Sequence, residues 1–267
     1  MKQQLFATIS ALAYAVAARP SPKVDTAAAA CDRATLIAVS DSYVAAQAAG
    51  QLDTLKGVDG STVYTQNFKT ATLASGLLSQ SFKIDHNRST HDTTQCATYT
   101  ELIIADTKNP HVVATQIRLS PNSTAAAPVI SKIETIVTST GDWLFNAPAT
   151  LRYASQESWV DIPEGKRDTR EAIQAAGDAY LDLFSDKSVK VPWGNPCARL
   201  EGGSYIQPSC NVGVPSGIKQ TNRRYVVDEV TGSVDIFFTF ANAEPDSHEF
   251  RVEGGKLRYV HTLTVMH

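Results

Sequence analysis

Hydrophobic residues recur at helical spacing in two segments that lie far apart in the chain. Residues 34–49 and 169–184 each carry apolar side chains three and four positions apart, which places these side chains on one face of an amphipathic helix. They are Leu36, Val39, Tyr43 and Ala46 in the first segment, and Ile173, Ala176, Tyr180 and Phe184 in the second. Tyr43 and Tyr180 occupy matching places at an offset of 137 positions (180 − 43), so the pattern predicts one unit that occurs twice.

Strand-like patterns, rich in β-branched and aromatic residues, follow each predicted helix after a long stretch of turn-forming residues. They cover residues 99–106, 111–119, 129–138 and 143–145 in the first half, and residues 223–229, 234–240, 248–253 and 256–265 in the second. Helices that are segregated from a meander of antiparallel strands predict an α+β fold with no parallel crossover. We therefore expect two tandem repeats, each made of one helix and one curved antiparallel sheet.

The two repeats are expected at residues 31–154 and 167–267, joined by a linker at 155–166 that carries Pro and Gly. At the N-terminus, Lys2 precedes an apolar run and then small residues, which is typical of a signal peptide over residues 1–18. Residues 19–30 are expected to be a flexible segment. The mature chain is thus predicted to be secreted and extracellular. No later apolar run approaches the roughly 20 residues that span a bilayer, so no membrane partner is expected.

Charge and motifs narrow the class of function. The formal net charge is −3 and no block of Lys or Arg occurs, so a nucleic-acid partner is not expected. The sequence has no phosphate-binding loop, no dinucleotide-binding turn and no Gly-x-Ser-x-Gly segment. Metal-binding spacings such as HxH and HExxH are missing too, although His248, His261 and a carboxylate would supply donor atoms. We therefore expect neither a cofactor nor a metal ion.

Four cysteines in a chain predicted to be secreted favour disulfides over thiolate chemistry. Three pairings are open. We favour Cys31 with Cys96 and Cys197 with Cys210, because each pair then lies within one repeat. Asn87 and Asn122 stand in Asn-x-Ser/Thr glycosylation sequences and are expected on exposed loops if they are used.

The last strand pair supplies the sharpest chemical prediction. Residues 253–256 read Glu-Gly-Gly-Lys, which is typical of a two-residue hairpin turn. Pairing outward from that turn sets Phe250 opposite Tyr259 and His248 opposite His261, all on one mainly apolar face. Partial burial and a neighbouring imidazole both disfavour protonation, so at least one ring is expected to be neutral near pH 7 and able to accept a proton. A slip of one residue would move one strand's side chains to the other face.

Further side chains are candidates to complete a catalytic site. Asp246 is placed to orient an imidazole, although Glu-Pro-Asp-Ser is also a typical turn sequence. Arg199, Arg223 and Arg224 are candidates to stabilise an oxyanion, with surface ion pairing as the alternative. The expected catalytic residues are His261, His248, Asp246 and Arg224, and the expected ligand-binding residues are Tyr180, Tyr259, Phe250 and Arg199.

The first repeat serves as an internal control. Aligning Gly141 with Gly255 puts Glu134 at the place of His248 and Ala147 at the place of His261. The histidine pair is therefore not required by the fold, and the second repeat is the expected active half.

Short segments of the chain resemble a known superfamily. The helix-then-meander order, with Gly-Asp-Trp at 141–143 and Gly-Gly-Lys-Leu-Arg-Tyr at 254–259, is similar to the nuclear transport factor 2 superfamily and its SnoaL-like polyketide cyclases. Residues 197–203 (Cys-Ala-Arg-Leu-Glu-Gly-Gly), 222–229 (Asn-Arg-Arg-Tyr-Val-Val-Asp-Glu) and 245–252 (Pro-Asp-Ser-His-Glu-Phe-Arg-Val) resemble an uncharacterised family of secreted fungal proteins. The resemblance implies a cone-shaped fold with an enclosed pocket. It does not imply one reaction, because the superfamily includes isomerases, cyclases, dehydratases and binding modules.

The sequence thus predicts a cofactor-independent lyase, isomerase or cyclase that moves a proton on a small, partly apolar molecule, with His261 and His248 as the acid and base. The alternative is a non-catalytic binding protein or effector with a small-molecule or protein partner. A pocket without convergent titratable groups would favour that alternative.

Overall fold

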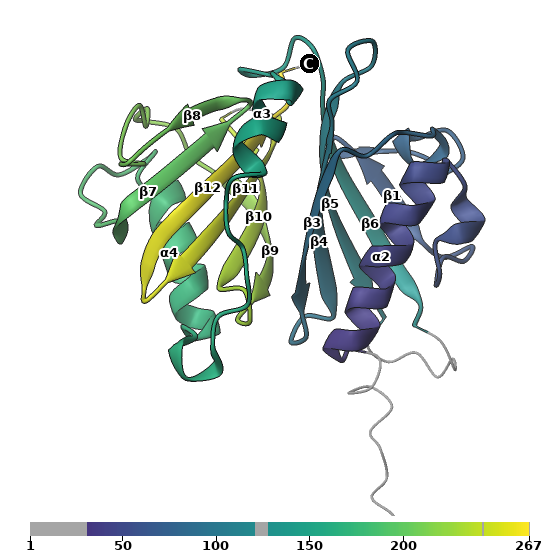
Figure 1. Cartoon of the computed structure of the whole chain (residues 1–267), viewed down its shortest axis with the longest axis horizontal. Coiled ribbons are helices and arrows are strands. Elements are labelled where there is room, and N and C mark those ends of the chain that lie inside the picture. Colours follow the sequence, from purple (N-terminus) through teal and green to yellow (C-terminus); the bar gives the residue numbers. More distant parts are fainter. Residues whose placement is uncertain (1–30, 121–127, 242, 267) are drawn as a thin grey trace, which may run out of the picture.

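The computed structural model describes residues 31–120, 128–241 and 243–266 (Figure 1). The predicted signal peptide at 1–18, the predicted segment at 19–30 and the sequon at Asn122 lie outside the described residues. Asn87 lies in a strand, β3 (His86–Asp92), and not on a loop, but its side chain is exposed.

The two predicted amphipathic helices are both present. The α-helices are α2 (Arg33–Ala49), α3 (Ala147–Ala154) and α4 (Arg170–Asp182), and the short 3₁₀ helices are η1 (Leu52–Thr54), η2 (Leu77–Ser79) and η3 (Glu164–Lys166). Helix α2 begins after Asp32, whose carboxylate accepts a hydrogen bond from the Thr35 N–H at 2.7 Å, and it ends at Gly50 with φ = 65°. Helix α4 is capped in the same way by Thr169, whose hydroxyl accepts from the Ala172 N–H at 3.3 Å.

Helix α3 was not predicted, and the strand predicted at 143–145 is wrong. Those residues form a turn that leads into α3. The Asn146 side chain starts the helix by accepting a hydrogen bond from the Ala149 N–H at 3.0 Å. Pro148 lies in the first turn, where its missing N–H leaves no hydrogen bond unmade. Asn followed by Ala-Pro is therefore a helix-start signal that the hydrophobic pattern did not reveal.

Each repeat contains a six-stranded sheet. The first sheet has the order β2-β1-β6-β5-β4-β3 and the second the order β8-β7-β12-β11-β10-β9. The strands of the first sheet are β1 (Val63–Gln66), β2 (Lys69–Thr70), β3 (His86–Asp92), β4 (Ala97–Ile104), β5 (His111–Leu119) and β6 (Ile130–Thr138). Those of the second are β7 (Trp193–Glu201), β8 (Ser204–Ile206), β9 (Thr221–Asp228), β10 (Ser233–Phe240), β11 (Glu244–Glu253) and β12 (Lys256–Thr264).

The sheets are mixed, not wholly antiparallel as predicted. The meander of four strands is antiparallel in both, but β1 pairs in parallel with β6, and β7 pairs in parallel with β12. These extra strands lie in the stretches that were expected to be irregular. The α+β class and the tandem arrangement are confirmed.

The two repeats pack sheet against sheet, with one helix on each outer side (Figure 1). One apolar cluster lies between α2 and the first sheet, and a second lies between α4 and the second sheet. A third cluster joins the facing surfaces of the two sheets and includes Tyr99, Ile136, Val226 and Phe237. Each sheet is therefore buried on both faces, which explains why polar side chains along the strands end up in the interior.

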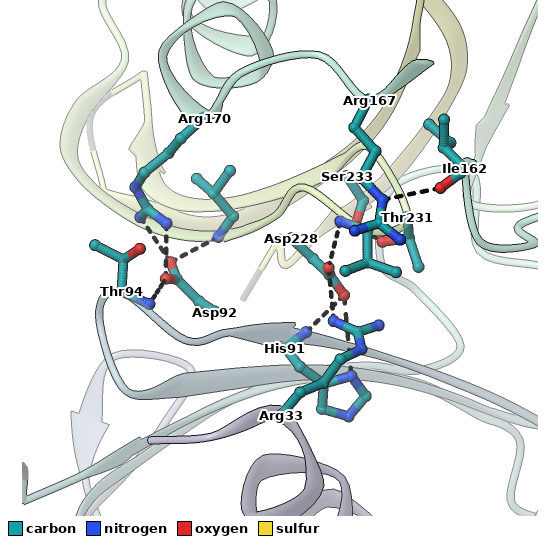
Figure 2. A network of polar contacts seen from close by, with 12 residues as sticks. Arg33, His91, Asp92, Thr94, Ile162, Arg167, Arg170, Asp228, Thr231 and Ser233 are labelled. Carbon is teal, nitrogen blue, oxygen red and sulfur yellow. Dashed lines mark hydrogen bonds and ion pairs between the residues drawn. The ribbon is translucent and has the colours of Figure 1, made fainter. Parts of the chain in front are cut away.

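Two ion pairs connect the repeats, and in each pair one repeat supplies the arginine and the other the aspartate (Figure 2). Arg170, in the first turn of α4, donates two hydrogen bonds of 2.7 Å to Asp92 of the first repeat. Arg33, in the first turn of α2, donates one of 2.8 Å to Asp228 of the second repeat. The arginines are 137 positions apart (170 − 33) and the aspartates 136 (228 − 92), so each repeat uses matching residues to hold the other.

Both predicted disulfides are confirmed: Cys31 bonds to Cys96, and Cys197 bonds to Cys210. In the part of the chain that the structure covers, no cysteine is left free.

Candidate functional site

The predicted alignment of the last hairpin is wrong beyond its first pairs. Glu253 pairs with Lys256 and Val252 with Leu257, as predicted, but Arg251 then pairs with Tyr259. Arg258 is the extra residue of a β-bulge, which shifts the rest of β12 by one position. His248 consequently pairs with Thr262, and His261 pairs with Glu249.

The bulge places the two histidines on opposite faces of the second sheet. A shift of one residue reverses the side to which a strand's side chains point. His248 packs on the α4 side, 5.6 Å from the ring of Tyr180 and 5.2 Å from that of Phe238, measured between centroids. His261 points into the space between the two sheets, where it meets Glu101 of the first repeat at 2.9 Å. The predicted imidazole pair therefore does not exist.

On the α4 side, His248 forms a dyad with Asp246. The ring atom Nδ1 lies 2.7 Å from Asp246 Oδ1, and Thr264 Oγ1 donates a hydrogen bond of 2.6 Å to Asp246 Oδ2. Asp246 lies within β11 and not in a turn, so the predicted orienting role fits its position. Burial raises the pKa of Asp246, while the hydrogen bonds from His248 and Thr264 favour its charged form.

The dyad sets the tautomer of His248. Because the Asp246 carboxylate accepts a hydrogen bond from His248, the proton of the neutral ring is assigned to Nδ1. The other nitrogen, Nε2, then keeps its lone pair. Among the described residues Nε2 has no hydrogen-bond partner, and His248 lines a cavity. An imidazole held in this way is an arrangement suited to accept a proton from a ligand.

The cavity lies at one end of the interface between α4 and the second sheet and has a volume of about 290 Å³. Its walls are largely aromatic and aliphatic, with a few charged groups among them. The lining side chains include Tyr180, Phe184, Ile218, Phe240, Met266 and Trp143, with Arg199, Glu201, Glu244, Asp246 and His248 as the titratable groups. An apolar enclosure with a few convergent polar groups is the usual form of a small-molecule site.

Arg199 and Tyr180 both line the cavity, and Arg199 is the one Lys or Arg residue among the described residues that line it. Arg199 Nη1 donates to the Tyr180 hydroxyl oxygen at 3.3 Å, and Arg199 Nη2 lies 3.3 Å from Glu201 Oε2. Burial raises the pKa of Tyr180 to about 12, against the opposing effect of the Arg199 charge. The phenol therefore stays protonated at neutral pH and remains a hydrogen-bond donor.

Two segments close the cavity wall. The disulfide from Cys197 in β7 holds Cys210, and the chain that follows supplies Gly213, Pro215 and Ile218 to the lining. Trp143 comes from the end of the first repeat, and its backbone N–H donates to the Thr264 carbonyl at 3.4 Å. The site of the second repeat is thus partly built by the first.

In the first repeat, the short helix η2 packs against α2. Leu77 and Leu78 of η2 are 5% and 2% exposed and belong to the cluster beneath α2. Gln47 Nε2 donates to the Leu77 carbonyl at 2.9 Å and fixes η2 in place. The hydroxyl of Tyr43, the residue that matches Tyr180, lies 2.7 Å from the Thr115 hydroxyl, whereas the hydroxyl of Tyr180 contacts an arginine. That the second repeat is the active half stays a prediction.

His261 belongs to a separate, buried charge cluster between the sheets. Its Nδ1 lies 2.9 Å from Glu101 Oε1 and its Nε2 lies 2.7 Å from Glu157 Oε2. Burial alone would lower the pKa of His261, but the charges of Glu101 and Glu157 outweigh it and raise the pKa to about 10. Both ring nitrogens of His261 are thus engaged by carboxylates, and neither faces the cavity beside His248.

Three side chains of the same cluster have the spacing of metal ligands, but an arginine side chain already pairs with its carboxylates. Ligand atoms of Glu101, Glu249 and His261 lie within 4.8 Å of one another. Arg88 forms ion pairs with both Glu101 and Glu249, so its guanidinium already neutralises the carboxylates. These contacts assign the cluster to the packing of the two repeats.

The remaining predicted residues lie outside the cavity. Arg224 forms an ion pair of 3.1 Å with Glu134 of the first repeat and lies over the ring of Phe68, so it does not stand beside His248 as predicted. Tyr259 stacks on Trp159 of the linker at 5.5 Å, on the face toward the first repeat, so it does not line the pocket as predicted. Phe250 is fully buried against Tyr180, at 5.1 Å, and packs beneath the site without lining it.

Sequence reasoning missed Glu201, Thr264 and Trp143, which all contact or line the site. Glu201 stands two residues after Arg199 on β7, so alternation along a strand would have placed the two side chains together. Trp143 carried no signal, because its contact depends on how the first repeat ends.

Comparison with protein families finds a match in the second repeat. Residues 166–264 match the family model of a domain of unknown function, DUF8021. A search of curated proteins gave no match for the chain.

Proposed function

We propose that this protein is a secreted, cofactor-independent enzyme of the lyase, isomerase or cyclase type, which moves a proton on a small, partly apolar molecule in the cavity of the second repeat. The observation that carries this proposal is the His248–Asp246 dyad, whose free Nε2 lines an apolar cavity beside Arg199 and Tyr180.

The arrangement supports a defined proton transfer. His248 Nε2 takes a proton from a carbon next to a carbonyl group, and the electrons of that C–H bond move into a new C=C bond. The carbonyl oxygen then gains negative charge, which the Tyr180 O–H and the Arg199 guanidinium stabilise. The imidazolium returns the proton to another carbon in an isomerisation, or to a leaving group at the β-carbon in an elimination. Asp246 stabilises the imidazolium throughout, as a carboxylate does in acid–base dyads.

One structural fact supports export. The chain has two disulfides, which persist in oxidising compartments. Together with the predicted leader at 1–18, they are the basis for proposing an extracellular protein. Within the residues that the structure describes, no helix combines the length and apolar character needed to cross a bilayer.

The fold is part of the proposal. One helix laid on a six-stranded sheet, with a cavity at the end of their interface, supports the resemblance to SnoaL-like members of the nuclear transport factor 2 superfamily. We propose a tandem arrangement of this fold, from a secreted fungal family, in which the second repeat is active.

A proton-exchange experiment tests the proposed activity. 2-Acetonaphthone carries exchangeable methyl protons beside a ketone, and their replacement by deuterium in D₂O is followed by ¹H NMR. The wild-type protein is expected to accelerate this exchange about 100-fold or more over buffer, the usual contribution of a placed base. His248→Gln is expected to return the rate to that of buffer, and Asp246→Asn to lower it at least tenfold.

The matched control is His111→Gln, the same substitution at a half-buried histidine of β5 that contacts Asn109. It is expected to leave the exchange rate unchanged. Binding of the ketone without any accelerated exchange would reject the enzyme and favour the alternative of a non-catalytic binding protein.

A further inference from the structure

The charges around the cavity are unevenly distributed. Three carboxylate side chains, Glu201, Glu244 and Asp246, line it together with one guanidinium, that of Arg199. His248 contributes no positive charge while it acts as a base. A negatively charged ligand would therefore meet more like charges than opposite ones, and like charges in a partly buried site repel strongly.

Glu201 offsets the charge of Arg199. The side chains are 22% and 7% exposed, and Glu201 Oε2 lies 3.3 Å from Arg199 Nη2. The other oxygen, Glu201 Oε1, accepts a hydrogen bond of 2.9 Å from Trp143 Nε1. Because Trp143 comes from the first repeat, the counter-ion of the cavity's guanidinium is held in place by the neighbouring unit.

Trp143 is itself firmly positioned. The segment around it is bonded to the second repeat by the Asn146 N–H, which donates to the Gly202 carbonyl, and by Asp142, which accepts from the Met266 N–H at 2.8 Å. A Cβ atom added at Gly202 would lie 2.3 Å from the Trp143 carbonyl oxygen, so the close approach requires glycine there. The indole is 48% exposed and offers a flat surface at the edge of the cavity.

Arg199 and Tyr180 each keep one hydrogen-bond donor for an acceptor atom of a ligand. Arg199 is only 5% exposed, and its Nε has no hydrogen-bond partner within the described residues. The Tyr180 oxygen accepts from Arg199, which leaves the phenolic hydrogen for another partner. A buried donor without an acceptor is unfavourable and calls for a partner from outside the chain.

We infer that the cavity takes an uncharged carbonyl compound with a flat apolar body, and that Glu201, held by Trp143, is the residue that excludes carboxylates. The inference rests on the proposed function for the placement of the reacting group, and it adds the chemical class of the ligand. At about 290 Å³ the cavity is at the lower end of the range for ligand pockets, which suits a molecule of one or two rings.

The arrangement also favours the reaction over mere binding. With Glu201 in place, Arg199 attracts a pre-existing anion weakly, yet its donors still meet the charge that develops on the carbonyl oxygen. Interactions that strengthen only as the transition state forms raise the rate without trapping the ligand.

The test compares two ligands of similar shape and different charge. Binding of 2-acetonaphthone and of 2-naphthoate to the full protein is measured by calorimetry at pH 7.5. The wild type is expected to bind the ketone at least tenfold more tightly than the carboxylate. Glu201→Gln removes the negative charge and is expected to tighten 2-naphthoate binding about tenfold, while the affinity for the ketone changes less than threefold.

Matched variants separate charge from general damage. Glu253→Gln makes the same substitution at the tip of the β11–β12 hairpin, away from the cavity, and is expected to change neither affinity. Trp143→Phe keeps an aromatic ring but removes the N–H that holds Glu201, and is expected to tighten 2-naphthoate binding in the same direction by a smaller factor. Tyr180→Phe is expected to weaken the ketone about tenfold.

The outcomes distinguish this inference from the proposed function. Equal or tighter binding of 2-naphthoate by the wild type, no millimolar binding of either ligand, or an unchanged preference in both Glu201→Gln and Trp143→Phe would overturn the ligand class. A switched preference combined with deuterium exchange that persists in His248→Gln would keep the ligand class and reject the proton-transfer role.

Discussion

Replacing Arg170 with alanine tests how strongly the reciprocal ion pairs join the two repeats. Arg170 donates to both oxygens of Asp92, and Asp92 is fully buried. Without the guanidinium, a buried carboxylate keeps only backbone donors, among them the Val227 N–H at 2.9 Å. Removing one partner of a buried ion pair destabilises a protein by about 3–5 kcal/mol. Because backbone donors remain, we expect the lower end, about 3 kcal/mol.

The pseudo-symmetric variant, Arg33→Ala, provides the comparison. Arg33 makes one hydrogen bond to Asp228, and its side chain is 28% exposed. Asp228 keeps the N–H groups of His91 and Val230 as donors at 3.0 and 2.9 Å. A partly exposed pair contributes about 1 kcal/mol or less. Arg33→Ala is therefore expected to be the milder substitution by about 2 kcal/mol.

Unfolding in guanidinium chloride, followed by far-UV circular dichroism and by tryptophan fluorescence, measures the difference. The shift of the midpoint at constant slope gives the change in the free energy of unfolding. Equal destabilisation by the two variants, or a loss below about 1 kcal/mol in Arg170→Ala, would contradict the reasoning from burial and from the number of hydrogen bonds.

Two further predictions concern the charge cluster and the disulfides. The pKa of His261 is about 10 in the folded protein against 6.5 for an ordinary histidine, so its contribution to stability is fully present below pH 6.5 and is lost as the pH rises through about 10. Melting temperatures from pH 6 to 10.5 are expected to fall more steeply in the wild type than in His261→Gln, and parallel curves would refute this assignment. Replacing Cys197 and Cys210 together by serine is expected to weaken ketone binding at least threefold by loosening the cavity wall. The same change at Cys31 and Cys96 is expected to lower stability and leave the affinity unchanged, and calorimetry combined with thermal melts separates the two.

Much of the architecture could be predicted because it follows from periodic patterns. The two helices appear as apolar stripes, and their shared place in each repeat indicated a duplicated unit. The disulfide pairing followed from assigning each cysteine to one repeat. The parallel strands β1 and β7 were missed, because both lie in stretches rich in turn-forming residues and neither shows a clear alternation of buried and exposed side chains.

The candidate site was predicted only in part, and the misplacement of His261 has its cause in a single residue. Arg258 is accommodated as a bulge, so every side chain of β12 beyond it faces the side opposite to the predicted one. Nothing local in the sequence distinguishes a bulged strand from a regular one. His248 and Asp246 lie on β11, which carries no extra residue, and they stand in the site. His261 follows Arg258 on β12 and points to the other face. The charge cluster around His261 was also hidden, because Glu101 and Glu157 reach it from distant parts of the chain.

The position of Trp143 bears on how this protein should be dissected. The region that matches the domain family begins at residue 166, so a fragment cut to that region would lack the indole and the segment that carries it. Such a fragment would present a cavity with an open side and with Glu201 released from its anchor. Ligand screens carried out on the isolated second repeat would then report a different selectivity from that of the whole chain, even if the fragment were perfectly folded.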